Sequence, residues 1–150
     1  MKDDKLNIFR LPVGWQYLTG NNLGGGLNSA NLQKYDQLVQ ACLNTGATCI
    51  IDVHNYARWN GQIIGQGGPS NDQFVNLWTQ IATKYKGQTK IAFGVMNEPH
   101  EVDINKVCEI PQHVFPDPNV GEFWFPFLND SESPRHSKMA LDLEKTLDIS

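Results

Sequence analysis

The strongest constraint on the fold is a regular alternation of apolar runs and helical patterns. Ranges 7–13, 48–53 and 90–96 are short, apolar and bounded by turn residues, so we interpret them as buried strands. The order along the chain is strand, helix, strand, helix, strand. Strands that are apolar on both faces and joined by helices form a parallel sheet covered by helices. The sequence therefore predicts an α/β fold, either doubly wound or a (β/α)8 barrel.

Both helical segments place their apolar residues on one face. The first face consists of Leu32, Tyr35, Leu38, Val39 and Cys42. The second consists of Phe74, Leu77, Trp78, Ile81 and Tyr85. We expect Asn28 or Ser29 to cap the first helix and Gly46 to end it. For the second helix, we expect Ser70 or Asn71 at the start and Gly87 at the end.

The pattern changes after about residue 106. Five of the eight prolines lie beyond this point, and no period of two or 3.6 residues persists until 137–147, a range with the spacing of a short helix. The helix and strand that would continue the alternation do not appear. We therefore divide the chain into an ordered β/α part, residues 1–106, and an irregular Pro-rich tail, residues 107–150.

Composition excludes several classes of partner. A net charge of −4 and a pI near 5.5 argue against nucleic acid and anionic membranes. No apolar run approaches the roughly 20 residues of a membrane span, and the N-terminus lacks the apolar segment of a secretory signal. The odd cysteine count (Cys42, Cys49 and Cys108) fits a reducing compartment or a missing partner. The histidines show no metal-ligand spacing, so we expect neither a metal nor a cofactor.

Three polar residues lie at or just beyond the ends of the predicted strands. Arg10, His54 and Glu98 are separated by 44 residues each time, about one β/α unit with its loops. In a parallel β/α fold such positions converge on one rim, where catalytic groups gather. An arginine, an imidazole and a carboxylate at one rim indicate proton transfer in a polar cleft.

Aromatic residues follow the same strand ends. Trp15, Tyr56 and Trp59 lie on the loops that leave the rim, and aromatic faces suit the apolar faces of sugar rings. Trp15 and Trp59 have two readings, because they either contact sugar or cover the rim by packing. Trp78 lies on the core face of a helix, and we assign it to packing.

Three motifs carry a resemblance to a known family. The segments IFRLPVGW (8–15), IDVHNYARWNG (51–61) and FGVMNEPH (93–100) resemble glycoside hydrolase family 5. The stretch IIGQGGP (63–69) is similar to fungal endo-β-1,4-glucanases in particular. The resemblance covers about residues 3–106 and implies a fragment of a (β/α)8 TIM barrel that contains strand units two to four.

The resemblance implies a role for each polar residue of the rim. Glu98 matches the acid/base that protonates the leaving glycosidic oxygen and later deprotonates water. Asn97 matches the residue that bonds the sugar 2-hydroxyl. Arg10 matches the arginine that keeps the nucleophilic carboxylate ionised, and His54 matches a histidine that lines the subsite of bond cleavage.

The remaining implications concern substrate, stability and location. Trp15, Tyr56, Trp59 and His100 are expected to bind substrate, and Cys42 and Cys49 match a family disulfide. We expect a monomer that acts on β-glucan polysaccharide without a cofactor, a nucleic acid or a membrane. The family is extracellular. Cellulose, mannan and xyloglucan are not separated by the segments present.

The departures from the family concern the second carboxylate. The family places its nucleophilic Glu on the seventh strand, which the matched units do not include. Glu122 superficially resembles a nucleophile motif, but it follows Glu98 by only 24 residues, too few for the intervening units. We interpret Asp52 as a hydrogen-bonded barrel residue that faces the same way as His54.

Two hypotheses follow from these departures. One is a retaining endo-β-1,4-glucanase. The other, which we favour for the chain as given, is a truncated or intron read-through product without turnover and with at most weak glucan binding. Three strands with two open edges also predict poor solubility or loose packing.

Overall fold

The computed structural model describes residues 6–103 and 123–124 of the 150-residue chain. Its elements in chain order are β1 (Ile8–Val13), α1 (Trp15–Thr19), α2 (Ser29–Asn44), β2 (Thr48–Val53), β3 (Arg58–Trp59), β4 (Gln62–Ile63), α3 (Asn71–Lys84), β5 (Ile91–Gly94) and β6 (Phe123–Trp124). The three predicted strands correspond to β1, β2 and β5, and the two predicted helices to α2 and α3. The predicted alternation is therefore confirmed.

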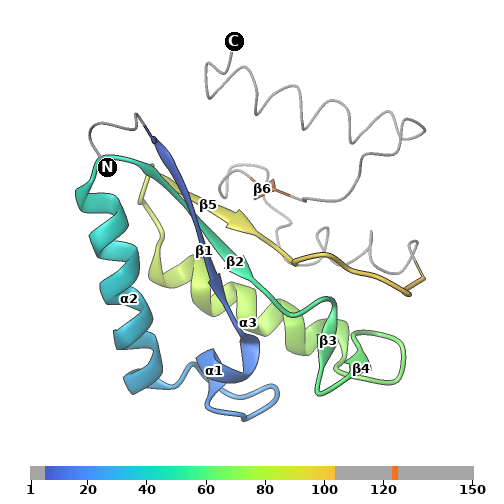
Figure 1. The fold of residues 1–150 in the computed structure, drawn as a ribbon. Coiled ribbons are helices and arrows are strands. Elements are labelled where there is room, and N and C mark those ends of the chain that lie inside the picture. The colour runs from blue at the N-terminus through green and yellow to red at the C-terminus, as the bar shows by residue number, and fades with distance from the viewer. Residues whose placement is uncertain (1–5, 104–122, 125–150) are drawn as a thin grey trace, which may run out of the picture.

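The principal sheet is parallel and has the strand order β1-β2-β5-β6. Its register pairs Arg10 with Ile50 and Asp52 with Gly94. Strands β3 and β4 form a separate antiparallel hairpin. In Figure 1 the carboxyl ends of β1, β2 and β5 run toward the end of the molecule where this hairpin lies. The sheet thus delivers the three predicted polar positions to one rim.

Helices α2 and α3 cover one face of the sheet (Figure 1). Cys49 of β2 forms a disulfide with Cys42 of α2, and the rings of Trp78 in α3 and Phe93 in β5 lie 5.8 Å apart. Alternate residues of a strand share a face, so the register places the following side chains on this helix-covered face: Phe9, Leu11, Val13, Cys49, Ile51, Val53, Ile91 and Phe93. All except Phe9 are buried, and together they form the core against the helices.

The helix ends follow the predicted capping chemistry. The side chain of Asn28 accepts a hydrogen bond from the backbone N–H of Asn31 at the start of α2. Ser70 and Gln73 form a capping box at the start of α3. Gly46 and Gly87 follow the two helices with φ values of 82° and 85°, a conformation that glycine adopts without strain.

One predicted core position is wrong. Leu38 is 49 % exposed, whereas Tyr35, Val39 and Cys42 of the same helix are buried. The buried residues lie four and three positions apart and form a narrow seam along α2. Leu38 is turned by about 100° from its neighbour Val39 around the helix and misses that seam. Helix α3 matches its prediction, because Phe74, Leu77, Trp78, Ile81 and Tyr85 are all buried.

Three short elements were not predicted. Helix α1 and the β3–β4 hairpin lie in stretches that we interpreted as loops, although Asn60-Gly61, with φ values of 48° and 80°, is a strong hairpin-turn signal. The expectation of no strand beyond residue 106 is wrong for Phe123–Trp124, which pairs with Phe93–Gly94. A two-residue strand held by backbone pairing has no side-chain period that a sequence could reveal.

The other predictions for the tail lie outside the described residues. They concern Cys108, Glu122 and the short helix at 137–147. Among the helices that the structure describes, none has the length and apolar content needed to cross a bilayer.

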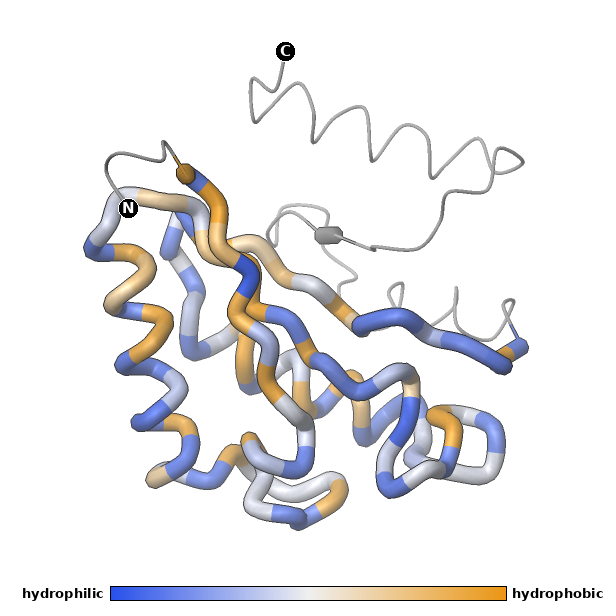
Figure 2. The backbone as a smooth tube through the Cα atoms, in the orientation of Figure 1, coloured by the Kyte–Doolittle hydropathy of each residue, from blue (hydrophilic) through white to orange (hydrophobic). Residues whose placement is uncertain are grey.

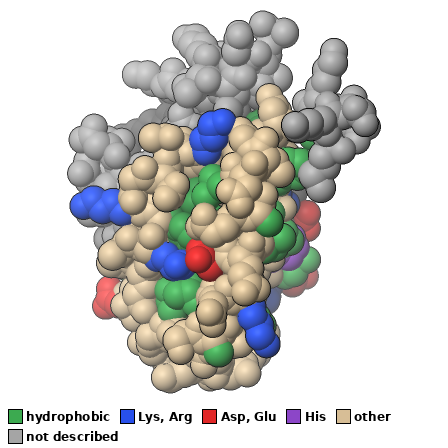
Figure 3. All heavy atoms as spheres, turned by 90° about the vertical axis from the view of Figure 1, so that its left-hand side faces the viewer, with side chains coloured by type: hydrophobic (Ala, Val, Ile, Leu, Met, Phe, Trp, Pro, Cys, Tyr) green, Lys and Arg blue, Asp and Glu red, His purple; other side chains and the backbone are tan. Residues whose placement is uncertain are grey.

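The surface separates into chemically different regions. Figure 2 shows that a short hydrophobic piece follows β5 and that a hydrophilic stretch comes after it, at the end of the molecule where the hairpin lies. Figure 3 shows the face at the left of Figure 1, where hydrophobic side chains are visible among scattered basic ones. Leu6 and Leu38 are among the large apolar side chains that remain exposed. The polar rim is therefore the region to search for chemistry.

Candidate active site

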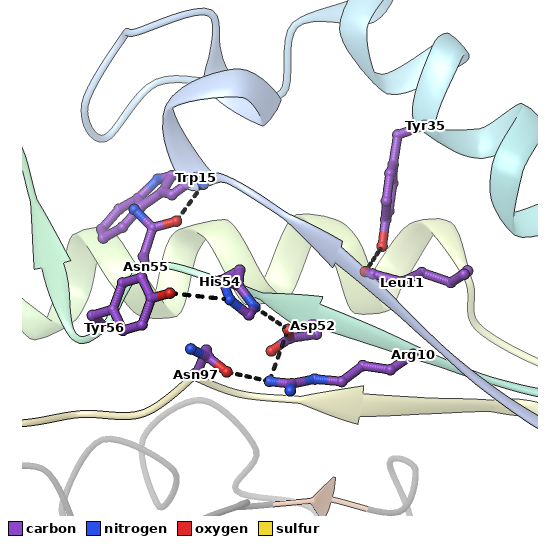
Figure 4. Close-up of polar contacts among 9 residues, drawn as sticks. All are labelled: Arg10, Leu11, Trp15, Tyr35, Asp52, His54, Asn55, Tyr56 and Asn97. Carbon is purple, nitrogen blue, oxygen red and sulfur yellow. Dashed lines mark hydrogen bonds and ion pairs between the residues drawn. The ribbon is translucent and has the colours of Figure 1, made fainter.

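A buried carboxylate organises the rim. Asp52, near the end of β2, is 1 % exposed. Its Oδ2 lies 2.9 Å from Nη2 of Arg10 on β1 and 2.7 Å from Nδ1 of His54 (Figure 4). A buried charge needs a paired and hydrogen-bonded partner, and Arg10 supplies the opposite charge. The prediction that Asp52 is a hydrogen-bonded residue of the barrel is confirmed.

The hydrogen bonds of His54 continue outward to an exposed aromatic ring. Because the Asp52 carboxylate accepts, Nδ1 of His54 donates, and Nε2 of the same ring lies 3.3 Å from the Tyr56 hydroxyl oxygen. The rings of His54 and Tyr56 meet edge to face at 5.3 Å. Tyr56 is 38 % exposed. The chain of contacts thus links a buried ion pair to a surface that a ligand can reach.

Asn97 joins the same cluster from the segment after β5. Its Oδ1 accepts from Nη2 of Arg10 at 2.5 Å, and its backbone N–H donates to the Val53 carbonyl at 3.1 Å. Asn97 is 1 % exposed, and its Nδ2 has no hydrogen-bond partner among the described residues. A buried amide without a protein partner is uncommon. This donor lacks a partner among the described residues, and it is enclosed, so a ligand hydroxyl reaches it only if the side chains that cover it move.

Glu98 lies beside this donor and is exposed. Its φ of 34° falls in the left-handed region, which non-glycine residues rarely adopt. Nδ1 of His100 lies 3.1 Å from the Glu98 carbonyl oxygen, and the rings of His100 and Tyr56 meet at 5.8 Å. The structure therefore brings Arg10, His54, Asn97, Glu98, His100 and Tyr56 to one rim, as the sequence predicted.

The two rim tryptophans pack instead of facing a ligand. Trp15 is 0 % exposed and Trp59 is 7 % exposed. Their rings meet at 5.1 Å, and Trp15 also lies 5.4 Å from Phe74 of α3. A side chain without accessible surface cannot contact a sugar. The expected substrate contact is therefore wrong for Trp15, and Trp59 offers almost no surface for one.

Asn55 is a residue of this region that the sequence analysis missed. It is buried, and its Oδ1 accepts from the backbone N–H of Trp15 at 2.7 Å (Figure 4). Its Nδ2 donates to Oε1 of Gln16 and to the carbonyl of Arg58. Asn55 thus ties the segment after β2 to α1 and to β3. Its place directly after His54, at a strand end, was the available signal.

The described residues contain no cluster suited to a metal. No group of three or more His, Cys, Asp or Glu side chains gathers there in a way that could hold an ion. Cys42 and Cys49 are committed to their disulfide. The chemistry of the described rim is that of carboxylate, amide, imidazole and guanidinium groups.

A parallel β/α sheet that presents a carboxylic acid beside a buried ion pair and a free amide donor is the rim of a (β/α)-barrel glycoside hydrolase. The chain belongs to glycosyl hydrolase family 5, because the family model described as "Cellulase (glycosyl hydrolase family 5)" matches residues 1–117. This match extends beyond the resemblance at residues 3–106. The sheet and its helices are part of a TIM barrel.

Similar proteins are fungal endoglucanases. Endoglucanase EG-II of Hypocrea jecorina is 62 % identical over 114 residues, which cover 76 % of this chain and 27 % of that protein. Endoglucanase 1 of Saitozyma flava is 58 % identical over 104 residues, which cover 68 % and 30 %. The crystal structure of Cel5A (EG2) from Hypocrea jecorina matches with a TM-score of 0.71 at 64 % identity, covering 72 % of this chain and 33 % of that one. The chain therefore spans about three tenths of the length of these curated relatives.

Proposed function

We propose that this chain carries the acid/base half of a retaining endo-β-1,4-glucanase site, with Glu98 as the general acid/base. The observation that carries the proposal is the pairing of an exposed carboxylate with a buried amide that has a free donor. Glu98 is exposed at the rim, and Nδ2 of the adjacent Asn97 has no partner among the described residues. Retaining glycosidases need an acid at the glycosidic oxygen and benefit from a hydrogen bond to the sugar 2-hydroxyl.

The neighbouring side chains take supporting roles in this proposal. Nη2 of Arg10 contacts both Asp52 and Asn97, so the guanidinium brings positive charge beside the site and orients the amide. A second carboxylate that approaches Arg10 would be kept ionised by that charge. Tyr56 is half-exposed and His100 is exposed, so both offer ring surface to a sugar.

The proposed substrate is an internal β-1,4-linked glucan, because relatives that are 62 % and 58 % identical are named endoglucanases. We expect a monomer outside the cell that needs no cofactor. Affinity electrophoresis in soluble cellulose, mannan and xyloglucan derivatives tests the choice of substrate. Retardation by mannan alone would contradict the glucanase assignment while leaving the family intact.

The 150-residue chain alone is proposed to bind glucan weakly and not to turn it over. A retaining mechanism needs a nucleophilic carboxylate about 5–5.5 Å from the acid/base. Asp52 is the strand carboxylate nearest to Glu98 in sequence, but it is buried and held by Arg10 and His54. An ionised carboxylate that is enclosed by two partners is a poor candidate for attack on an anomeric carbon.

Reducing-end release from soluble cellulose tests this proposal directly. We expect no release by the purified chain, and weak retardation in affinity electrophoresis. Turnover that disappears in Glu98→Gln would show that a nucleophile is present and would overturn the binding-only proposal. Turnover that persists in Glu98→Gln would contradict the assignment of Glu98.

An added nucleophile tests the acid/base role without a second carboxylate. Azide can attack the anomeric carbon of an aryl β-cellobioside, so that a C–N bond forms, the bond to the aryl oxygen breaks, and Glu98 donates the proton to that oxygen. With a poor leaving group, we expect azide-dependent release that falls about 100-fold or more in Glu98→Gln. Equal release by the wild-type chain and the variant would refute the role of Glu98.

A further inference from the structure

The backbone of Glu98 is held in a conformation that it would not adopt freely. Its φ is 34°, and it precedes Pro99, which further restricts the conformations open to it. Such a residue persists in a rare region only where the surrounding structure holds it there. The direction of the Glu98 side chain therefore depends on contacts made on both sides of it in the chain.

The contacts before Glu98 come from the sheet. The backbone N–H of Asn97 donates to Val53 at the end of β2, and the side chain of Asn97 accepts from Arg10 of β1. Asn97 is almost fully buried. The position of the chain up to Glu98 is thus fixed by β1 and β2.

The contact after Glu98 comes from one side chain. Nδ1 of His100 lies 3.1 Å from the Glu98 carbonyl oxygen. A carbonyl oxygen can only accept, so the imidazole must carry a proton on Nδ1. This hydrogen bond fixes the peptide plane between Glu98 and Pro99.

The His100 ring is itself held by the rim. It meets the ring of Tyr56 at 5.8 Å, and Tyr56 bonds to His54, which bonds to the buried Asp52. The segment that carries His100 is also tied to the loops around the β3–β4 hairpin. Glu101 pairs with Arg58 at 3.5 Å, and the backbone N–H of Asp103 donates to Gln66 at 3.2 Å.

We propose that His100 is a positioning residue for Glu98, acting through an Nδ1–H hydrogen bond to the Glu98 carbonyl. The contacts from Asp52 through His54 and Tyr56 hold the His100 ring in place, and the ring in turn holds the backbone of Glu98. Loss of the bond lets the Glu98 peptide rotate and changes the direction of its carboxylate. The inference deepens the proposed function and rests on the role of Glu98 given there.

Nuclear magnetic resonance of the full chain tests the hydrogen bond without any turnover. In ¹⁵N-labelled protein, the long-range correlations of the neutral His100 ring are expected to show the proton on Nδ1 and none on Nε2. A ring with its proton on Nε2 would overturn the proposal, whether the chain is ordered or not.

Two variants test whether the bond positions Glu98. His100→Phe keeps a ring against Tyr56 but removes the donor, so the Glu98 carbonyl ¹³C resonance should move upfield while the resonances of β2 and β5 stay unchanged. His100→Asn retains a donor at the place of Nδ1 and should restore the wild-type Glu98 resonance. Glu101→Gln is the matched control, since its exposed pair with Arg58 contributes little, and it should leave Glu98 unchanged.

The resonance of Glu98 tests the positioning role of His100, and azide-dependent release tests the acid/base role of Glu98. An unchanged Glu98 resonance in His100→Phe, or no recovery in His100→Asn, would overturn the positioning role. Failure of azide-dependent release in the wild-type chain would instead count against the acid/base role, and the tautomer and Glu98 resonance would be unaffected by it.

Discussion

The two faces of the principal sheet satisfy their side chains in different ways. The helix-covered face is apolar throughout, and its residues are buried against α2 and α3. The opposite face carries Arg10, Asp52 and Thr48 among smaller or half-buried apolar residues. Burial of apolar surface is non-directional, whereas Arg10 and Asp52 on the opposite face pair with each other at a fixed distance.

This difference separates stability from chemistry. The helix-covered face holds the β/α units together, and other apolar side chains of about the same volume could serve there. The opposite face orients Asn97 and, through it, Glu98 by directional contacts. Substitutions on the first face should therefore lower the free energy of unfolding, and substitutions on the second should mainly change site geometry.

The largest expected effect is that of Trp78→Ala on the helix-covered side. Trp78 is 0 % exposed, packs on Phe74 and Phe93, and donates through Nε1 to the Val95 carbonyl. We expect the free energy of unfolding to fall by about 3–5 kcal/mol, because a large cavity and an unpaired carbonyl remain. Chemical denaturation followed by circular dichroism measures this.

The control for Trp78→Ala lies on the opposite face. Ile50 is half-buried there, so Ile50→Ala should lower the free energy of unfolding by about 1 kcal/mol. Equal losses for the two substitutions would mean that the helix-covered face is not the main source of stability.

The second effect concerns the disulfide that joins α2 to β2. Cys42 and Cys49 are seven residues apart, and closing so short a loop stabilises the fold by about 2.5 kcal/mol in the chain-entropy model. The double variant Cys42→Ser, Cys49→Ser should show that loss in denaturation experiments. A wild-type chain kept under reducing conditions should match it. If reduction instead abolishes the His54 and Glu98 resonances while the core remains folded, the two faces are coupled more closely than the contacts indicate.

The same contrast between faces explains how far the sequence could predict this fold. On the helix-covered side, the apolar residues that repeat along the sequence are the ones that become buried. The strands, both helices and the whole core face of α3 were therefore predicted correctly. The prediction that Leu38 is buried was wrong, because the spacing of apolar residues does not give the width of the buried seam on α2. Helix α1, the β3–β4 hairpin and β6 are too short to carry a period, and only Asn60-Gly61 marked one of them in advance.

Predictions for the candidate site depended on strand ends. Arg10 lies within β1, His54 directly follows β2 and Glu98 follows β5, so their convergence at one end of three neighbouring parallel strands was predictable from topology. The double role of Arg10, which binds both Asp52 and Asn97, was not predictable, because side-chain rotamers select partners at distances that a sequence does not encode. The packing of Trp15 against Trp59 depends on the direction of α1 and was likewise outside the pattern.

The third prediction removes the charge at the centre of the opposite face. Asp52→Asn keeps an acceptor but leaves Arg10 without its ionic partner, and we expect a loss of about 2 kcal/mol. The loss should be smaller than for a fully buried pair, because the Arg10 side chain is 32 % exposed and is screened by water. Asp72→Asn on the surface of α3 is the matched control, with an expected change within about 0.5 kcal/mol.

The resonances of His54 report on Asp52→Asn more specifically than stability does, because Asp52 orients the His54 ring. The variant should change the His54 and Tyr56 resonances while the indole N–H of Trp78 stays in place. A shift of the Trp78 signal as large as that of His54 would show that the polar cluster supports the core, and the separation of the two faces would fail.

The smallest effect at neutral pH comes from a polar contact within the helix-covered face. The Tyr35 hydroxyl of α2 donates to the Leu11 carbonyl of β1 at 2.7 Å, and Tyr35 is buried. Tyr35→Phe should lower the free energy of unfolding by about 1 kcal/mol near pH 7. Burial, with smaller contributions from the charges of Tyr85 and Asp52, raises the pKa of Tyr35 above its ordinary value of 10.0.

The raised pKa makes the contribution of Tyr35 depend on pH. The native state keeps the hydroxyl proton more tightly than the unfolded state, so this stabilisation is complete below pH 10.0 and is lost as the pH rises further. The wild-type chain should therefore lose stability above that pH, and Tyr35→Phe should lose less over the same range. Parallel alkaline curves for the two proteins would mean that another group controls unfolding at high pH. In that case the single polar contact would play no part in holding α2 to the sheet under alkaline conditions.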